Sequence, residues 1–93
     1  MTDREVLAAA RELISDKNRW CQGSEAEDAA GRWILPSHLN AVRWCALGAV
    51  EKVSDISRAL DIFADTMDVI NINDDMGHEA ILAYLDARIE EMQ

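Results

Sequence analysis

The chain has 93 residues, is 49% hydrophobic, and carries nine Lys/Arg against eighteen Asp/Glu, a net charge of −9. This length fits one domain spanning residues 1–93, and no apolar run is long enough for a membrane span. Dispersed bases among so many acids disfavour direct binding to nucleic acid or to an anionic membrane.

The charge is unevenly divided along the chain. Residues 1–46 contain six bases and seven acids, whereas residues 47–93 contain three bases and eleven acids. The C-terminal half should therefore attract basic surfaces. Two cysteines do not form a disulfide framework, and the N-terminus lacks the pattern of a signal peptide. We therefore expect a cytoplasmic protein.

The first helix is predicted over residues 3–15. Thr2 and Glu5 have the spacing of a capping box, in which each side chain bonds the other's backbone N–H. Apolar residues then recur at helical spacing on one face. These are Val6, Leu7, Ala10, Leu13 and Ile14.

A long connection follows, over residues 16–36. Because a structureless loop of this length is unusual in a compact domain, we expect it to contain a short extra helical turn. Ser24 and Glu27 have the spacing of a second capping box, and Gly31 stands where a C-terminal cap belongs. A short β-pair is the alternative, with few candidate partners.

The second helix is predicted over residues 38–53, with Ser37 as its N-cap. It is apolar almost all round, as buried helices are. Gly48 inside it costs about 1 kcal/mol relative to Ala, so a close approach of another helix should compensate. The Ala-rich first helix is the expected neighbour.

Two further helices complete the prediction. The third runs from Ser54 or Asp55 to about Asp68, and the last covers residues 78–92. Between them, residues 73–77 have the composition of a turn. The sequence thus predicts an all-α, compact bundle of about four helices.

The segment Ala41–Ala49 reads Ala-Val-Arg-Trp-Cys-Ala-Leu-Gly-Ala. With Trp20 and Gly23 before it and Asn73–Asp74 ahead of the last helix, the chain resembles a family of small bacterial and phage proteins of unknown function. In that family a Trp-Cys-Ala-Leu-Gly-Ala helix precedes an Asn-Asp turn and a closing amphipathic helix. An aromatic residue often precedes Asn-Asp there, where this chain has Ile72. The resemblance implies a compact helical fold and a bacterial or phage origin, and it supplies no catalytic residue.

Cys45 is the stronger candidate nucleophile, because Cys21 has no His or Asp at a recognisable motif spacing. With His38 or His78, and with Asn73 to orient the histidine, it would supply the residue types of a Cys-His-Asn system. A reactive thiol needs exposure and a cationic neighbour or a helix N-terminus, whereas Cys45 should lie inside the most apolar helix. We therefore name no catalytic residue, and we expect no cofactor and no metal. A small cysteine-dependent enzyme stays the alternative.

The acidic residues of the last two helices are the stronger candidates. On a continuous third helix, Asp61, Asp65 and Asp68 would form one stripe, and such like charges cost helix stability. Solubility alone could explain that stripe. The functional hypothesis is that these acids form a docking surface for a basic protein. That partner could be a protein whose basic groove normally holds nucleic acid. Its expected residues are Asp61, Asp65, Asp68, Asp74, Asp75, Glu79, Asp86 and Glu90.

A second candidate interface lies in the tryptophan-bearing half, because Arg and Trp are enriched at binding hot spots. Its residues are Arg19, Trp20, Arg32 and Trp33. Mutual packing of the three tryptophans is the simpler account, since a small domain needs their buried area. We predict a non-enzymatic interaction protein, an inhibitor or adaptor such as a phage-encoded inhibitor of a host defence complex. An oligomeric structural protein is a further alternative.

Overall fold

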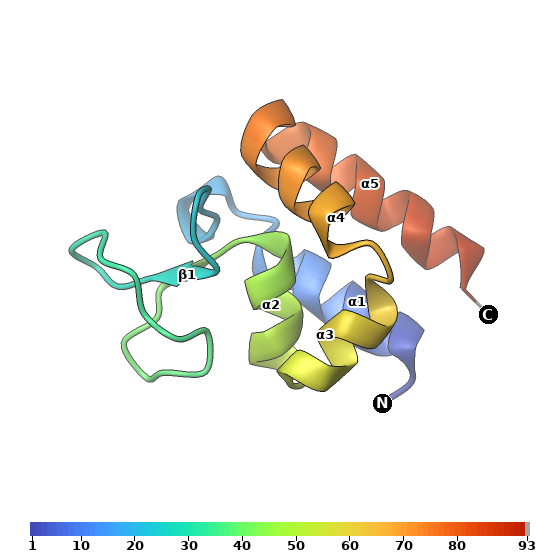
Figure 1. Cartoon of the computed structure of the whole chain (residues 1–93), viewed down its shortest axis with the longest axis horizontal. Helices are drawn as coiled ribbons and strands as arrows, with labels where there is room; N and C mark the ends of the chain where they lie inside the picture. The colour runs from blue at the N-terminus through green and yellow to red at the C-terminus, as the bar shows by residue number, and fades with distance from the viewer. Residues whose placement is uncertain (93) are drawn as a thin grey trace.

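The computed structural model describes residues 1–92, and in this part of the chain it is mostly helical (Figure 1). Five α-helices pack together with two short helical turns and one antiparallel β-pair. Their bounds are α1 Asp3–Leu13, η1 Lys17–Arg19, β1 Ala26–Glu27, β2 Arg43–Trp44, α2 Ala46–Val53, α3 Ile56–Ile62, α4 Thr66–Asn71, η2 Ile72–Met76 and α5 His78–Glu91. The predicted helical class is confirmed, and the β-pair is an addition to it.

The first helix follows the prediction closely. The Thr2 hydroxyl accepts the Glu5 N–H at 3.2 Å, and the Glu5 carboxylate accepts the Thr2 N–H at 2.9 Å, so the capping box is present. The predicted stripe is buried except for Leu13, which is partly buried against the core. Local signals determine this helix because its cap and its apolar face lie within one short segment.

The long connection does contain a short helical turn, η1, but it lies at Lys17–Arg19 and not between Ser24 and Gly31, where the alternative of a β-pair is found. Ala26 and Glu27 instead pair with Trp44 and Arg43 to form the antiparallel β-pair. The Asp28 side chain then turns the chain, because its Oδ1 accepts backbone N–H groups of Ala30 and Arg32, both at 2.9 Å. Gly31 occupies the left-handed region at φ +79° within this turn. Pairing with a distant segment has overridden the local capping signals.

The helix predicted over 38–53 begins only at Ala46. Residues before it form a loop in which Leu39 is 96% exposed, followed by β2. The Trp44 indole donates to the Pro36 carbonyl at 3.0 Å, and this bond folds the loop back on itself. Cys45 has extended backbone, and its sulfur accepts the Gly48 N–H at 3.3 Å as the cap of α2. The placement of Cys45 inside a helix is therefore also wrong.

The predicted third helix is interrupted. It divides into α3 and α4 at the buried Phe63, and Asp65 caps α4 by accepting the Asp68 N–H at 3.1 Å. Arg88 on α5 fixes the end of α3 by donating to the Ile62 carbonyl at 2.8 Å. The break lets Phe63 and Val69 both enter the core, whereas a continuous helix would have buried Leu60 and Met67.

The predicted turn at 73–77 is a wide helical turn, η2, and Gly77 at φ +98° separates it from α5. The last helix ends at Glu91 and buries Ile81 and Leu85, close to its predicted bounds. The core lies among the helices, with α1 packed against both α2 and α5.

We call residues 26–44, which contain β1, the Asp28 turn, the loop and β2, the lobe. The molecule measures 38 × 26 × 22 Å, and the lobe lies at one end of the long axis, with the C-terminal end of α5 toward the other (Figure 1).

Candidate functional site

The residues that carry the family resemblance meet at Asn73. Its side-chain oxygen accepts the Trp20 indole N–H at 2.8 Å and the Ala46 backbone N–H at 3.0 Å. Its amide nitrogen donates to the Cys21 carbonyl at 3.0 Å and to Asp74 Oδ1 at 2.9 Å. Asn73 is 1% exposed, and a buried amide with this many partners fixes its neighbours in place.

Asp74 and Gln22 extend these contacts. Asp74 Oδ1 accepts the Gly23 N–H at 3.0 Å, and the Gln22 amide donates to the Asn73 and Asp74 carbonyls at 3.2 and 2.9 Å. We call this set of bonds between residues 20–23, Ala46 and residues 73–74 the Asn73 junction. It joins the first connection, α2 and η2, which are far apart in the sequence.

Gly48 explains how the segment just before the lobe packs against α2. A Cβ on Gly48 would lie 1.9 Å from the Glu25 carbonyl oxygen, so only glycine permits this approach. The same oxygen accepts the Cys45 N–H at 3.1 Å. The close contact at Gly48 is therefore with the Glu25 backbone and not with a helix, although α1 does pack against α2 as predicted.

A small pocket of about 160 Å³ lies beside the junction. Cys45, Leu47 and Val69 give it apolar walls, and Asp74 lies at its polar side. The amide donors of Asn73 and the Oδ1 acceptor of Asp74 already form hydrogen bonds within the protein. The junction therefore has a structural role and does not offer these groups to a ligand.

The cysteine thiols are poorly suited to nucleophilic chemistry. Cys45 does lie at a helix N-terminus, but it is buried, and this burial raises the pKa of its thiol to about 12. Burial and the charge of Glu27 raise the pKa of Cys21 to about 11. Both residues therefore remain protonated at neutral pH.

The residues of the suggested Cys-His-Asn system are not brought together as one. His38 lies in the lobe, where its Nδ1 accepts the Asn40 N–H at 3.0 Å. His78 Nε2 is 2.7 Å from the Ile14 carbonyl, and its ring lies 5.0 Å from the Trp20 ring. Asn73 supports Trp20 and Ala46 and orients neither histidine.

A carboxyl pair, Glu25 and Glu51, was missed by sequence reasoning. Glu51 Oε2 is buried and has no hydrogen-bond partner within residues 1–92. Burial, a hydrogen bond with the Glu25 side chain and the charge of Glu25 raise the pKa of Glu51 to about 8. The two residues are 26 positions apart in the sequence, so no local pattern indicated the pair.

The acidic residues proposed for docking have different roles. Asp65 caps α4, Asp74 holds the Asn73 junction, and Asp86 pairs with Arg11 at 2.9 Å. The predicted single stripe is therefore wrong, because Asp61 lies on α3 and Asp68 on α4. The remaining exposed members are Asp61, Asp68, Asp75, Glu79 and Glu90.

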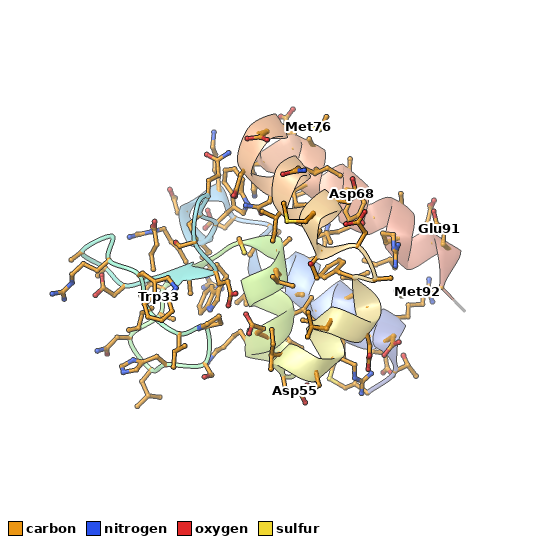
Figure 2. All side chains as sticks on the ribbon, viewed as in Figure 1. Trp33, Asp55, Asp68, Met76, Glu91 and Met92 are labelled. Atoms are coloured by element: carbon orange, nitrogen blue, oxygen red, sulfur yellow. The ribbon has the colours of Figure 1, made fainter. Side chains whose placement is uncertain are left out.

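Three acids lie close enough to Tyr84 on α5 for their charges to act on its hydroxyl group. Burial raises the pKa of Tyr84, the charges of Asp68, Asp65 and Glu91 raise it further, and Arg88 opposes them. Figure 2 shows Asp68 and Glu91 in the part of the molecule built from α4 and α5. We call Asp65, Asp68 and Glu91 around Tyr84 the acidic face. Glu91 was not among the predicted residues.

The second candidate interface is divided by the fold. Trp20 is buried at the Asn73 junction and Trp44 is buried where the lobe meets the core, whereas Trp33 is 64% exposed. Arg19 is exposed, and Arg32 pairs with Asp28 at 3.0 Å. Mutual packing of all three tryptophans is therefore incorrect for Trp33.

No group of three or more His, Cys, Asp or Glu side chains within residues 1–92 is arranged to hold a metal ion. Over the same residues, no helix has the length and apolarity needed to cross a membrane.

The fold and the junction define a small, mostly helical protein with one short β-pair. The model of a family of unknown function, DUF6197, matches residues 1–91, and the chain belongs to this family. Comparison with curated proteins gave no match. Comparison with solved structures likewise gave none.

Proposed function

We propose that this protein is a non-enzymatic interaction module that binds a basic protein surface through the acidic face. The observation that carries the proposal is that the exposed acids Asp65, Asp68 and Glu91 all act through their charges on the half-buried Tyr84. Complementary charge on a partner would raise the association rate and make binding depend on salt.

The charges of this face are poorly compensated from within the protein. Arg88 is the cation that acts on Tyr84, and one of its guanidinium nitrogens already donates to the Ile62 carbonyl. Met67 lies between Asp65 and Asp68 in the sequence. It is 61% exposed on α4 and adds apolar surface to this region. An aromatic ring, an exposed thioether and surrounding charges are a combination found at protein interfaces.

The role follows from that chemistry. An acidic surface can occupy a basic groove that normally holds nucleic acid, so we propose an inhibitor or adaptor acting in the cytoplasm. A phage-encoded inhibitor of a host defence complex is the specific form of this proposal. Burial and a raised thiol pKa at Cys45 oppose the alternative of a cysteine enzyme.

The test replaces Asp61, Asp65 and Asp68 with Asn and Glu91 with Gln in one variant. Asn is as good an N-cap as Asp, so α4 keeps its cap while the face loses its charge. Binding to fluorescent Arg-rich and Lys-rich peptides is measured by anisotropy over a salt series. We expect at least about tenfold weaker binding and a shallower salt dependence.

The matched control removes charge elsewhere, with Glu12→Gln, Asp75→Asn, Glu79→Gln and Glu90→Gln, all at exposed positions. It lowers the net charge equally and should leave most of the affinity intact. Equal losses in both variants would mean that total charge, and not the acidic face, attracts the peptides. Unchanged binding in the first variant would refute the proposal.

A further inference from the structure

The lobe has an open backbone edge at Trp33. Trp33 lies opposite Glu27, and two bonds flank this pair, from Ile34 N–H to the Ala26 carbonyl at 3.2 Å and from Asp28 N–H to the Arg32 carbonyl at 3.0 Å. In this antiparallel pattern the Trp33 N–H and C=O point away from β1. Neither group has a hydrogen-bond partner within residues 1–92. Such an edge is a template for another strand.

Exposed apolar side chains lie at several other positions of the lobe and its loop. Trp33 is 64% exposed, Leu35 56%, Leu39 96% and Val42 39%. Leu39 and Val42 line a groove of about 380 Å³ together with Ala29 and Ala30 of the Asp28 turn. Exposed apolar groups gathered in this way mark interaction sites on soluble proteins. Figure 2 shows Trp33 in the lobe, away from the helices.

The lobe is also electrically neutral. Its two acids and two bases form the pairs Glu27–Arg43 and Asp28–Arg32, each at 3.0 Å. The rest of the chain therefore carries the whole net charge of −9. Two copies of so acidic a chain repel each other over most of their surface. The neutral lobe, at one end of the 38 Å axis, is where they can meet with least repulsion.

We propose that the lobe is a homodimer interface. The edge at Trp33 pairs antiparallel with the same edge of a second copy, as the two-fold symmetry of a homodimer allows. Trp33 of each copy enters the Leu39 and Val42 groove of the other. This arrangement covers the open edge and the apolar patch together, and it keeps the acidic bodies apart. It does not depend on the function proposed for the acidic face.

The test is sedimentation velocity on the full chain over a range of concentrations. We expect a reversible dimer, and we expect Trp33→Glu and Leu39→Glu each to weaken it at least about tenfold. Both side chains are exposed in the single chain, so the far-UV circular dichroism should stay unchanged, as should the Tm measured at a concentration where the wild type is monomeric. Added salt should leave the dimer intact or strengthen it, because screening reduces repulsion between the bodies.

The control is Met67→Glu, which places the same charge at an apolar residue of similar exposure on α4. It should leave the dimer intact. A wild-type chain that stays monomeric at high concentration and high salt would overturn the proposal. A dimer that survives both lobe variants, or that Met67→Glu disrupts equally, would do the same. A monomer whose Trp33 binds phosphatidylcholine vesicles would assign the patch to lipid instead.

Discussion

The lobe and the helical body bury their apolar residues to very different degrees. In the body, Leu7, Phe63 and Ile81 are at most 1% exposed, whereas in the lobe Leu39 is almost fully solvated. The lobe contributes Ala26, Ala41 and Trp44 to the core, and polar bonds hold its outer part, such as those from Arg43 to Glu27 at 3.0 Å and to the Asp28 carbonyl at 2.7 Å. Apolar content alone therefore does not indicate where the core lies. Hydrogen bonding to distant segments decides which apolar residues enter it.

The largest expected effect separates two tryptophans of the lobe. Trp44→Ala removes a buried ring that also bonds the Pro36 carbonyl, and it should lower the free energy of unfolding by about 3–5 kcal/mol. Trp33→Ala should lower it by less than about 0.5 kcal/mol, because its ring is exposed. Urea unfolding measures both values at a concentration where the chain is monomeric. Equal losses of unfolding free energy in the two variants would contradict the distinction between the buried Trp44 and the exposed Trp33.

Next in size is the Asn73 junction. Asn73→Ala leaves the Trp20 indole N–H and the Ala46 N–H without their shared acceptor, at a cost of about 3 kcal/mol or more. Asn71→Ala, at an exposed position two residues earlier, is the control and should stay within about 0.5 kcal/mol. Urea unfolding followed by tryptophan fluorescence measures the difference. Similar values for the two variants would show that the junction contributes little.

Gly48→Ala tests the contact between α2 and the segment that leads into the lobe. The added Cβ would collide with the Glu25 carbonyl, so this segment must move away from α2. We expect a net loss of about 1–3 kcal/mol, although Ala is the better helix former by about 1 kcal/mol. Hydrogen exchange at the Cys45 amide, which bonds Glu25, should become faster. A more stable variant would refute the close contact.

The smallest effect concerns the pH dependence of Glu51. Its pKa is about 8 in the folded chain and near the ordinary 4.5 when unfolded, so the folded state keeps a proton that the unfolded state releases. Stability should therefore fall as pH rises from about 4.5 to 8, with the full loss present above that range. Glu51→Gln should remove this decline and raise the Tm at pH 9 by about 5 °C.

The control for this pH dependence is Glu12→Gln, at an exposed position of α1. It should leave the Tm profile between pH 5 and 9 unchanged. If Glu51→Gln followed the wild-type profile, the Glu25–Glu51 pair would not be coupled to folding.

The candidate sites were less predictable than the helices. The sequence suggested that Asn73–Asp74 and the Cys45 segment matter, but it placed Cys45 inside a helix and Asn73 in a simple turn. It grouped Asp61, Asp65 and Asp68 on one helix because their spacing suits one. Because Asp65 is the N-cap of a separate helix, α4, the three residues do not lie on one face of a single helix. Glu51 could not be recognised, because its partner lies 26 residues earlier in the chain.

By itself, the sequence determined the helical class, the capping box at Thr2, both ends of α5 to within a residue, and the acidic C-terminal half. These features depend on caps and periodicity within a few residues of one another. Only the tertiary structure decided the β-pair, the late start of α2 at Ala46 and the exposure of Trp33. Each depends on contacts such as that of Ala26 with Trp44, and contacts across so many residues outweigh weak local preferences.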